Sequence, residues 1–228
     1  MMHSPLVTEP LFRIGAIPVS TPVATTWALM ALVALTAAAM RRRLSLTPGK
    51  LQTAVELFVS TLDSQLQDTM QIDPAHCRAM LGTLFLFILT SNWSGLIPGV
   101  EPPTAHLETD AALAAVVFAS TVFYGVHERG LARYLASFAQ PTWIMIPLNL
   151  VEQITRTFSL IVRLFGNVMS GVFVIGIVLS LAGLLVPIPL MALDLLTGAV
   201  QAYIFTILAA VFIGAALGDE RAATPHPR

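Results

Sequence analysis

Five long apolar runs divide this sequence, and they constrain its fold more than any other feature. A helix of about 20 apolar residues is long enough to cross the hydrocarbon core of a bilayer. Only 11% of the residues are charged and 56% are hydrophobic, whereas a soluble domain has about 25% charged residues. The sequence therefore predicts an all-α integral membrane protein that forms a single membrane domain over residues 1–228. Its five transmembrane helices are predicted over residues 24–40, 79–97, 111–126, 147–185 and 190–217.

A further segment, residues 51–70, is amphipathic. Its apolar residues fall on one face of a helix, whereas Glu56, Asp63 and Asp68 lie elsewhere on the helix surface. Such a segment is too polar to span a bilayer. We expect it to form a helix that lies in the membrane interface or docks on a partner helix.

The basic residues predict the orientation, because loops on the cytoplasmic side carry an excess of lysine and arginine. With the N-terminus outside, Arg13 lies outside and the cytoplasmic set is Arg41, Arg42, Arg43, Lys50, Arg78, Arg129, Arg133, Arg221 and Arg228. Residues 1–22 then form an outer, periplasmic lead and residues 218–228 a cytoplasmic tail. An arginine triplet after the first run is typical of a retained anchor, and the lack of a leader rich in arginine and serine favours the bacterial plasma (inner) membrane.

Charge and motifs exclude several classes of function. The net charge is −1 at pH 7 and no basic tract is present, which argues against nucleic acid as a partner. We find no metal-site spacing, no glycine-rich phosphate loop and no nucleophile elbow, and the single cysteine excludes an internal disulfide. We therefore expect no catalytic site, no metal and no cofactor on this chain. Trp93, His106 and His127 lie near span ends and are interpreted as interfacial residues.

The fourth run carries a line of polar residues along an otherwise apolar helix. At about 100° per residue, spacings of three and four place these residues on one helical face. They are Glu152, Arg156, Ser159, Arg163, Asn167 and Ser170. An arginine at the bilayer centre costs roughly 2.5–3.5 kcal/mol on insertion scales. The line is therefore typical of a surface that faces water or a charged partner.

The fifth run adds a second polar set, which consists of Asp194, Thr197 and Gln201. The fourth run is longer than a perpendicular crossing needs, so tilt or a bend is predicted, and the Val-Pro-Ile-Pro segment at 186–189 is predicted to form the turn. In such a hairpin Gln201 lies level with Arg163, and Asp194 lies about 10 Å farther toward the outside. Because arginine keeps its proton while carboxyls exchange theirs, this layout favours ion transfer along two offset aqueous paths.

Other interpretations of these residues remain open at this point. Glu152 and Arg156 can form an ion pair at the membrane edge, since they are four residues apart. Asp194 can be a buried carboxyl bonded to Thr197 or to a neighbouring helix, and Arg163 can pair with Asp194 or Glu152. The chain can then be a purely structural membrane subunit. A stand-alone proton or sodium transporter is a further alternative, although we find no internal repeat of the kind that many transporters have.

Several motifs resemble subunit a of the F-type ATP synthase. The most specific is RLFGN at 163–167, which is followed by QAYIF at 201–205 in the next run. SNWSG at 91–95, PLNLVE at 147–152 and residues 209–214 are also similar, so the resemblance covers nearly the whole chain. It implies a non-enzymatic membrane stator beside a rotating ring of c subunits, held by peripheral-stalk b subunits. It also implies that the essential arginine is Arg163, with Asn167 and Gln201 as polar partners and Glu152 as the inner-path acid.

The resemblance further implies that the last two spans form a long tilted hairpin along the ring, where Gly166 and Gly171 let another helix approach closely. Passage of H⁺ or Na⁺ would then be coupled to ATP synthesis or hydrolysis. One position departs from the pattern, because many family members carry a glutamate where this chain has Val172. We expect Asp194 to replace that acid. The departure leaves open a divergent second type of the family that is coupled to sodium.

Overall fold

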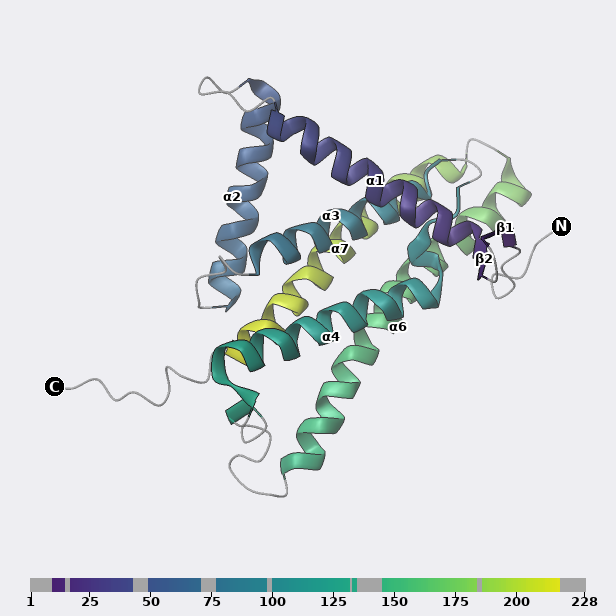
Figure 1. The fold of residues 1–228 in the computed structure, drawn as a ribbon. Helices are drawn as coiled ribbons and strands as arrows, with labels where there is room; N and C mark the ends of the chain where they lie inside the picture. The colour runs from purple at the N-terminus through teal and green to yellow at the C-terminus, as the bar shows by residue number, and fades with distance from the viewer. Residues whose placement is uncertain are drawn as a thin grey trace.

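The computed structural model of the protein describes residues 10–14, 17–42, 49–70, 77–97, 100–131, 133–134, 145–183 and 186–217. The described part is almost entirely helical (Figure 1). Its elements in chain order are β1 (Pro10–Ile14), β2 (Ile17–Ser20), α1 (Thr21–Arg42), α2 (Lys50–Met70), α3 (Arg78–Ser94), the short 3₁₀ helix η2 (Pro103–Ala105), α4 (Leu107–Arg129), α6 (Met145–Ala182) and α7 (Pro187–Leu217).

Four of these helices are long and apolar enough to cross a membrane: Thr21–Arg42, Leu107–Glu128, Met145–Leu181 and Pro187–Leu217. They support the predicted helical membrane fold. The predicted second span corresponds to α3, which has 17 residues, about the shortest length that crosses a bilayer. The 38 residues of α6 extend for about 57 Å at about 1.5 Å per residue, so this helix fits a layer of about 30 Å only when it is strongly tilted.

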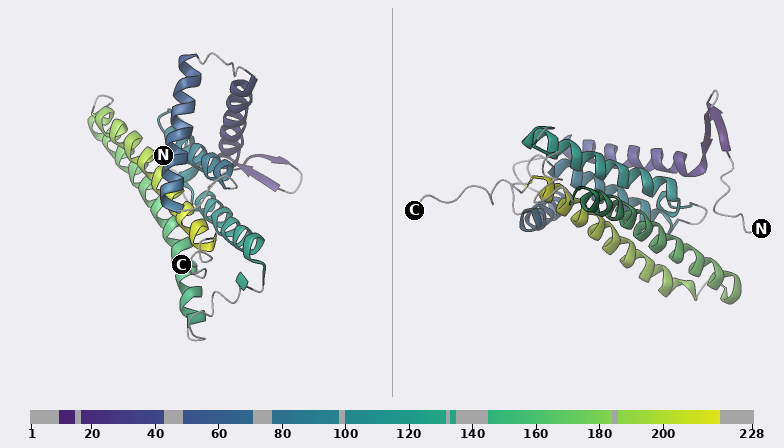
Figure 2. Two further views of the ribbon diagram at one scale, coloured as in Figure 1. Left: turned by 90° about the vertical axis from the view of Figure 1, so that its left-hand side faces the viewer. Right: turned by 90° about the horizontal axis from the view of Figure 1, so that it is seen from below.

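The helices give the molecule two distinct ends. At one end lie the β1–β2 hairpin, η2 and the junction of α6 with α7, and we call this the η2 side (Figures 1 and 2). At the other end α2 connects the last turn of α1 with the first turn of α3, and we call this the α2 side. Two hydrogen bonds fix the arrangement, because Asn92 and Trp93 near the end of α3 donate to Gly198 and Leu195 in the first half of α7.

The central helix is α7, which contacts α2, α3, α4 and α6. Its buried face alternates small and large side chains, with Ala202, Phe205, Ala209 and Ile213 among the most buried residues of the chain. Small residues let helices approach closely in lipid, where packing replaces the hydrophobic effect as the main source of association. The core of the molecule therefore surrounds α7.

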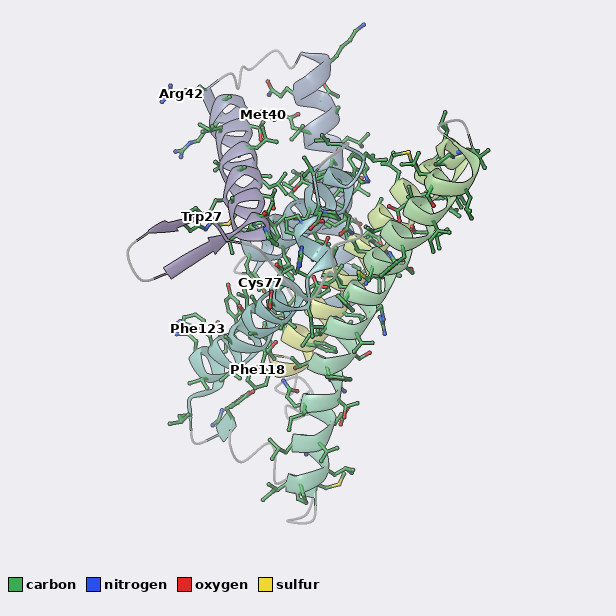
Figure 3. All side chains as sticks on the ribbon, turned by 90° about the vertical axis from the view of Figure 1, so that its right-hand side faces the viewer. Trp27, Met40, Arg42, Cys77, Phe118 and Phe123 are labelled. Atoms are coloured by element: carbon green, nitrogen blue, oxygen red, sulfur yellow. The ribbon has the colours of Figure 1, made fainter. Side chains whose placement is uncertain are left out.

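The peripheral helix is α1, whose described side chains beyond Pro22 are all at least partly exposed. Figure 3 shows Trp27 toward the η2 side of this helix and Arg42 at its opposite end. A tryptophan near one end and arginines at the other are typical of a helix anchored between two membrane interfaces.

The amphipathic helix α2 is docked on α7 through its second half, where Leu66 and Met70 are buried. The hydroxyl of Tyr203 donates a hydrogen bond to Gln65 Oε1 at 2.9 Å, and Asp63 pairs with Arg78 of α3. In the first half of α2 the predicted apolar face is exposed at Val55 and Val59, whereas the ring centre of Phe58 lies 5.4 Å from that of Phe85 on α3. In this chain, the predicted helix therefore finds a partner helix for only part of its length.

The predicted turn at 186–189 is wrong, because α7 already begins at Pro187. Pro187 and Pro189 both lie in the first turn of α7, where the missing N–H has no helical partner to lose and the fixed φ suits a helix. The third predicted span also begins earlier, at Leu107 instead of residue 111. Its first turn holds Glu108 and Asp110, and acidic residues are favourable at the positive end of a helix.

The outer lead contains an exception to the all-α prediction, since β1 and β2 pair as an antiparallel hairpin in which Ile14 lies opposite Ile17. The strands are rich in branched apolar residues, which suit extended backbone. Several predictions concern residues outside the described part: the first nine residues, Arg43 of the arginine triplet, and the tail at 218–228 with Arg221 and Arg228.

Candidate functional site

An open groove of about 610 Å³ lies between α6 and α7 in the α2-side half of the molecule. We call it the α6–α7 groove, and it is lined by Leu148, Val151, Glu152, Thr155, Arg156, Ser159, Leu160, Arg163, Leu208 and Phe212. Four members of the predicted polar line share it, because their spacing of three or four residues keeps them on one face of α6. The structure therefore brings Glu152, Arg156, Ser159 and Arg163 together in one groove whose other lining residues are mostly apolar.

Glu152 and Arg156 form an ion pair inside this groove, between Glu152 Oε1 and Arg156 Nη2. The guanidinium of Arg156 also lies 5.3 Å from the ring centre of Phe212 on α7, within the range of a cation–π contact. Both charged side chains are partly exposed, so the pair contributes at most about 1 kcal/mol to stability. Its main effect is to hold Arg156 against α7 and to orient the Glu152 carboxylate.

Arg163 lies at the end of the groove nearest the middle of α6, and its side chain is exposed. Its guanidinium donates to Ser159 Oγ at 3.4 Å, within the same helix. Among the residues that the structure describes, no carboxylate pairs with Arg163, so neither Asp194 nor Glu152 neutralises it there. The guanidinium of Arg163 is therefore exposed, and Ser159 is its hydrogen-bond partner among the described residues.

Asp194, Thr197 and Asn167 meet at the η2-side end of the α6–α7 contact. Asn167 Nδ2 lies 3.5 Å from the Thr197 carbonyl, and Thr197 Oγ1 donates to the main-chain oxygen of Asp194 at 3.1 Å. The Asp194 carboxylate thus does not accept the Thr197 hydroxyl. It is half-buried and packs against the backbone of α6 at Gly171.

The two glycines that were predicted to allow close helix approach differ in their surroundings. A Cβ at Gly171 would meet Asp194 Cγ at 2.9 Å, whereas a Cβ at Gly166 would meet nothing within 4 Å. Gly171 thus makes room for an acid of this same chain. Gly166 lies exposed one turn from Arg163 and remains open to an approaching helix.

Gln201 lies apart from the other predicted site residues. Its side chain is only 6% exposed, and in the described part of the chain its Nε2 has no hydrogen-bond partner. No hydrogen bond between Gln201 and Arg163 occurs among the described residues. A buried amide donor without a partner is unusual, so this group is available to an acceptor such as a water molecule.

A buried network between α3, η2 and α7 was not predicted from the sequence. Thr104 Oγ1 donates to Asn92 Oδ1 at 2.7 Å, and Asn92 Nδ2 donates to the Gly198 carbonyl at 2.9 Å. The indole of Trp93, which was interpreted as an interfacial anchor, donates to the Leu195 carbonyl at 3.1 Å. The available signal was the cluster of Ser, Asn and Trp that closes the second apolar run, because polar side chains in a span can hydrogen-bond to another helix.

The comparisons with known proteins agree with the resemblance inferred from the motifs. The family model described as ATP synthase A chain matches residues 23–214. A protein named ATP synthase subunit a 2 from Bradyrhizobium sp. strain BTAi1 is 54% identical over 96% of this chain and 98% of its own length. The ATP synthase subunit a of Albidiferax ferrireducens is 44% identical over 93% of this chain and 92% of its own length.

A third relative, ATP synthase subunit a 1 of Chlorobaculum tepidum, is 44% identical over 90% of this chain and 94% of its own length. Such identity covers nearly the full length of this chain and of each relative. It confirms the family that the RLFGN block and the accompanying motifs indicated. The chain belongs to the ATP synthase A chain family, as a multi-pass membrane member of it.

Proposed function

We propose that this chain is the stator subunit a of the membrane sector of an F-type ATP synthase. It assembles with a ring of c subunits, with peripheral-stalk b subunits and with the rest of the complex. The chain has no active site of its own. It provides the path by which H⁺ or Na⁺ crosses the membrane while the ring turns, and this movement is coupled to ATP synthesis or hydrolysis.

The observation that carries the proposal is the exposed guanidinium of Arg163 in an apolar surface. An arginine at this depth is strongly unfavourable unless it faces water or an opposite charge. No described carboxylate of this chain supplies that charge. A carboxylate on another subunit fits the position, because arginine stays protonated and stabilises the ionised form of an acid that comes close. Each ring carboxylate would meet Arg163 in turn.

Two acids on opposite sides of Arg163 support two offset half-channels. Glu152 precedes Arg163 by eleven residues on α6, or about 16 Å along the helix axis. Asp194 packs against Gly171, which follows Arg163 by eight residues, or about 12 Å. We assign the α2-side half-channel to the groove with Glu152, Arg156 and Ser159. The η2-side half-channel then contains Asp194, Asn167 and Gln201.

The orientation in the membrane follows from the basic residues. Arg41, Arg42, Lys50 and Arg78 all lie on the α2 side, and an excess of such residues marks the cytoplasmic side. We propose five spans, namely α1, α3, α4, α6 and α7, with the N-terminus outside and the C-terminus in the cytoplasm. The helix α2 then lies at the cytoplasmic interface toward the peripheral stalk, and the bacterial plasma membrane is the proposed location.

The test is ATP-driven ion uptake into inverted vesicles that hold the whole complex, with and without sodium. We expect Arg163→Ala to assemble in normal amounts and to abolish uptake, and the sodium dependence of the wild type to identify the ion. Val162→Ala is the matched control, because it shortens an exposed neighbour without changing charge. Full uptake by the Arg163→Ala complex would instead support a structural role for the polar line.

A further inference from the structure

A second group of polar side chains is buried on the η2 side, away from Arg163. It consists of Asn92 at the end of α3, Thr104 in η2, and His106 and Asp110 at the start of α4. We call it the η2 polar cluster. Asp110 is its most unusual member, because its side chain is 0% exposed and neither carboxylate oxygen has a hydrogen-bond partner among the described residues.

The backbone at Asp110 is fixed, since its N–H donates to the His106 carbonyl at 3.3 Å in the first turn of α4. The helix α4 contacts η2, α6 and α7, and η2 also contacts α1 and α3. In their η2-side halves, the described groups that carry or exchange charge are Glu101, His106, Glu108 and Asp194. Arg13 of β1 is the one basic residue at this end of the described chain. No fixed cation of these helices therefore balances Asp110.

An ionised carboxylate without a donor or a cation is strongly unfavourable in a buried site. A site of this kind holds the carboxyl either with a proton or with a bound cation. Unpaired buried polar groups are rare in folded proteins, and they call for an explanation such as an ion, a water molecule or a role in a reaction. Asp110 therefore has the chemistry of an ion-binding group.

The cluster is connected to the surface on one side and to α7 on the other. Glu101, which is 70% exposed, lies 3.5 Å from Nε2 of the buried His106. On the inner side, the hydrogen bonds from Thr104 to Asn92 and from Asn92 to Gly198 reach α7. Gly198 is one helical turn from Asp194. Polar groups thus lie at two levels on the η2 side, with Glu101 and His106 toward the surface and Thr104 and Asn92 beside α7. Asp110 is one helical turn from His106.

We propose that Asp110 binds the translocated cation, H⁺ or Na⁺, as an intermediate station of the η2-side half-channel. This inference rests on the proposed function and assigns one further residue to it. The carboxylate takes up one cation from the η2 side and releases the same cation toward Asp194, so no other bond forms or breaks. Glu101 and His106 lie at the entrance of this route. Asp110 supplies a buried acid on α4, in a chain that has Val172 at the position where many family members carry a glutamate.

The experiment uses the whole complex in inverted vesicles, where the lumen corresponds to the η2 side. The rate of ATP synthesis is measured against lumenal pH without sodium, and against lumenal sodium at fixed pH. These two series distinguish the proton from sodium. For Asp110→Asn we expect the half-saturating ion concentration to rise by at least about tenfold, because a charged partner of the cation is lost. We expect the rate of ATP synthesis to depend on the ion concentration outside the vesicle as it does in the wild type.

The matched control is Glu108→Gln, which removes an exposed carboxyl two residues away in the same helical turn. We expect wild-type half-saturation for it. Asp110→Glu keeps the carboxyl and moves it by one methylene, and we expect a smaller shift than for Asp110→Asn. An assembled Asp110→Asn complex with wild-type half-saturation would overturn the proposal. If that variant does not assemble, wild-type half-saturation of Asp110→Glu would overturn it.

The failure of this inference can be separated from a failure of the proposed function. Arg163→Ala is measured in the same vesicles, and the proposed function requires no synthesis at any lumenal ion concentration. If Arg163→Ala abolishes synthesis while Asp110→Asn behaves as wild type, only the role of Asp110 is wrong. If Arg163→Ala remains active, the proposed function itself is wrong.

Discussion

The carboxylate of Asp194 on α7 lies against the backbone of Gly171 on α6, where a Cβ at residue 171 would meet Asp194 Cγ at 2.9 Å. Gly171 is the immediate neighbour of Val172, the position at which the family pattern has an acid. The missing side chain at 171 gives an acid from the facing helix the space to reach α6. This contact supports the proposal that Asp194 serves the η2-side half-channel in place of a glutamate on α6.

Gly171→Ala should weaken the contact between α6 and α7. The added methyl group overlaps the Asp194 carboxylate, and overpacking of this kind typically costs about 1–3 kcal/mol. The expected result is a lower temperature of dissociation for the purified complex and slower ion uptake per assembled complex. Gly176→Ala is the control, since a Cβ there meets nothing within 4 Å and alanine is by itself the better helix former.

The double variant Gly171→Ala with Asp194→Ala tests whether the overlap is the cause. Removal of the carboxylate makes room for the new methyl group, so the stability should return close to that of Asp194→Ala alone. If the two changes are instead additive in stability, the Gly171 backbone and the Asp194 side chain do not touch, and the assigned packing is incorrect.

Asn92→Ala should destabilise the junction of α3, η2 and α7 more than an exposed polar substitution does. It removes the donor to Gly198 and leaves the buried Thr104 hydroxyl without its acceptor. A buried polar group without a partner costs roughly 1–3 kcal/mol. Hydrogen exchange of α3 and the first half of α7 should therefore be faster in the variant complex.

The control for that prediction is Asn92→Ala combined with Thr104→Val. With both polar partners removed, no hydroxyl is left unsatisfied, and part of the lost protection should return. The increase in exchange rate is also measured for Asn92→Ala and Thr104→Val alone. If the increase in the double variant equals the combined increases of the two single variants, Asn92 and Thr104 act independently.

The sequence was sufficient to predict the long helices and the residues that share one face of a helix. Helical spacing predicted the polar line from Glu152 to Arg163, and the structure places its residues in one groove, because the line depends only on the geometry of α6. Apolar length likewise predicted the four helices that are long and apolar enough to cross a membrane. The start of α7 was missed, since two prolines in four residues read as a turn although both suit a first helical turn.

The tertiary contacts were beyond the sequence for a different physical reason. Nothing in the spacing of Asn92 or Asp110 indicates which helix covers them, because a polar residue at a span end is satisfied by water as easily as by another helix. Burial of Asp110 depends on how η2 packs against the start of α4, and η2 lies between two apolar runs, where apolar length predicts no helix. Similarly, only the position of α7 decides which half of α2 is covered.

Leu66→Ala should release α2 from α7. Leu66 is fully buried in this contact, and removal of a large buried side chain costs about 2–5 kcal/mol. The free energy of local opening of α2, measured by hydrogen exchange in the solubilised complex, should fall by a comparable amount. Leu57→Ala is the control, because Leu57 is on the same helix and exposed. Equal effects of the two substitutions would contradict the docked position of α2.

Cys77 should resist alkylation in the assembled complex. The thiol lies buried at the start of α3 (Figure 3), and burial raises its pKa. Thiols react as thiolates, so both lower access and a smaller thiolate fraction slow the reaction. Because the chain has one cysteine, labelling of this subunit with N-ethylmaleimide reports on Cys77 alone. Labelling before denaturation that is as fast as labelling in detergent-denatured protein would contradict the burial of this residue.

Glu152→Gln should slow ion transport without loss of assembly. The carboxylate pairs with Arg156, but the two side chains are 50% and 39% exposed, and an exposed pair contributes only about 0–1 kcal/mol. If Glu152 and Arg156 form only a structural ion pair at the membrane edge, Glu152→Gln and Arg156→Gln should therefore lower the transport rate by similar, small amounts. An ion-carrying Glu152 predicts a loss of transport rate of about 10²-fold or more for Glu152→Gln, as for the removal of a proton-transfer group.

Arg156→Gln separates the two possibilities, because it breaks the same pair and leaves the carboxylate in the groove. Without its partner, Glu152 remains able to take up and release an ion, so transport should fall much less than in Glu152→Gln. The comparison is made as ATP-driven uptake per assembled complex in the same vesicles. Equal rates for the two variants would show that Glu152 is not in the ion path. The ion pair would then have a structural role, in which Arg156 contacts the ring of Phe212 and joins α6 to α7.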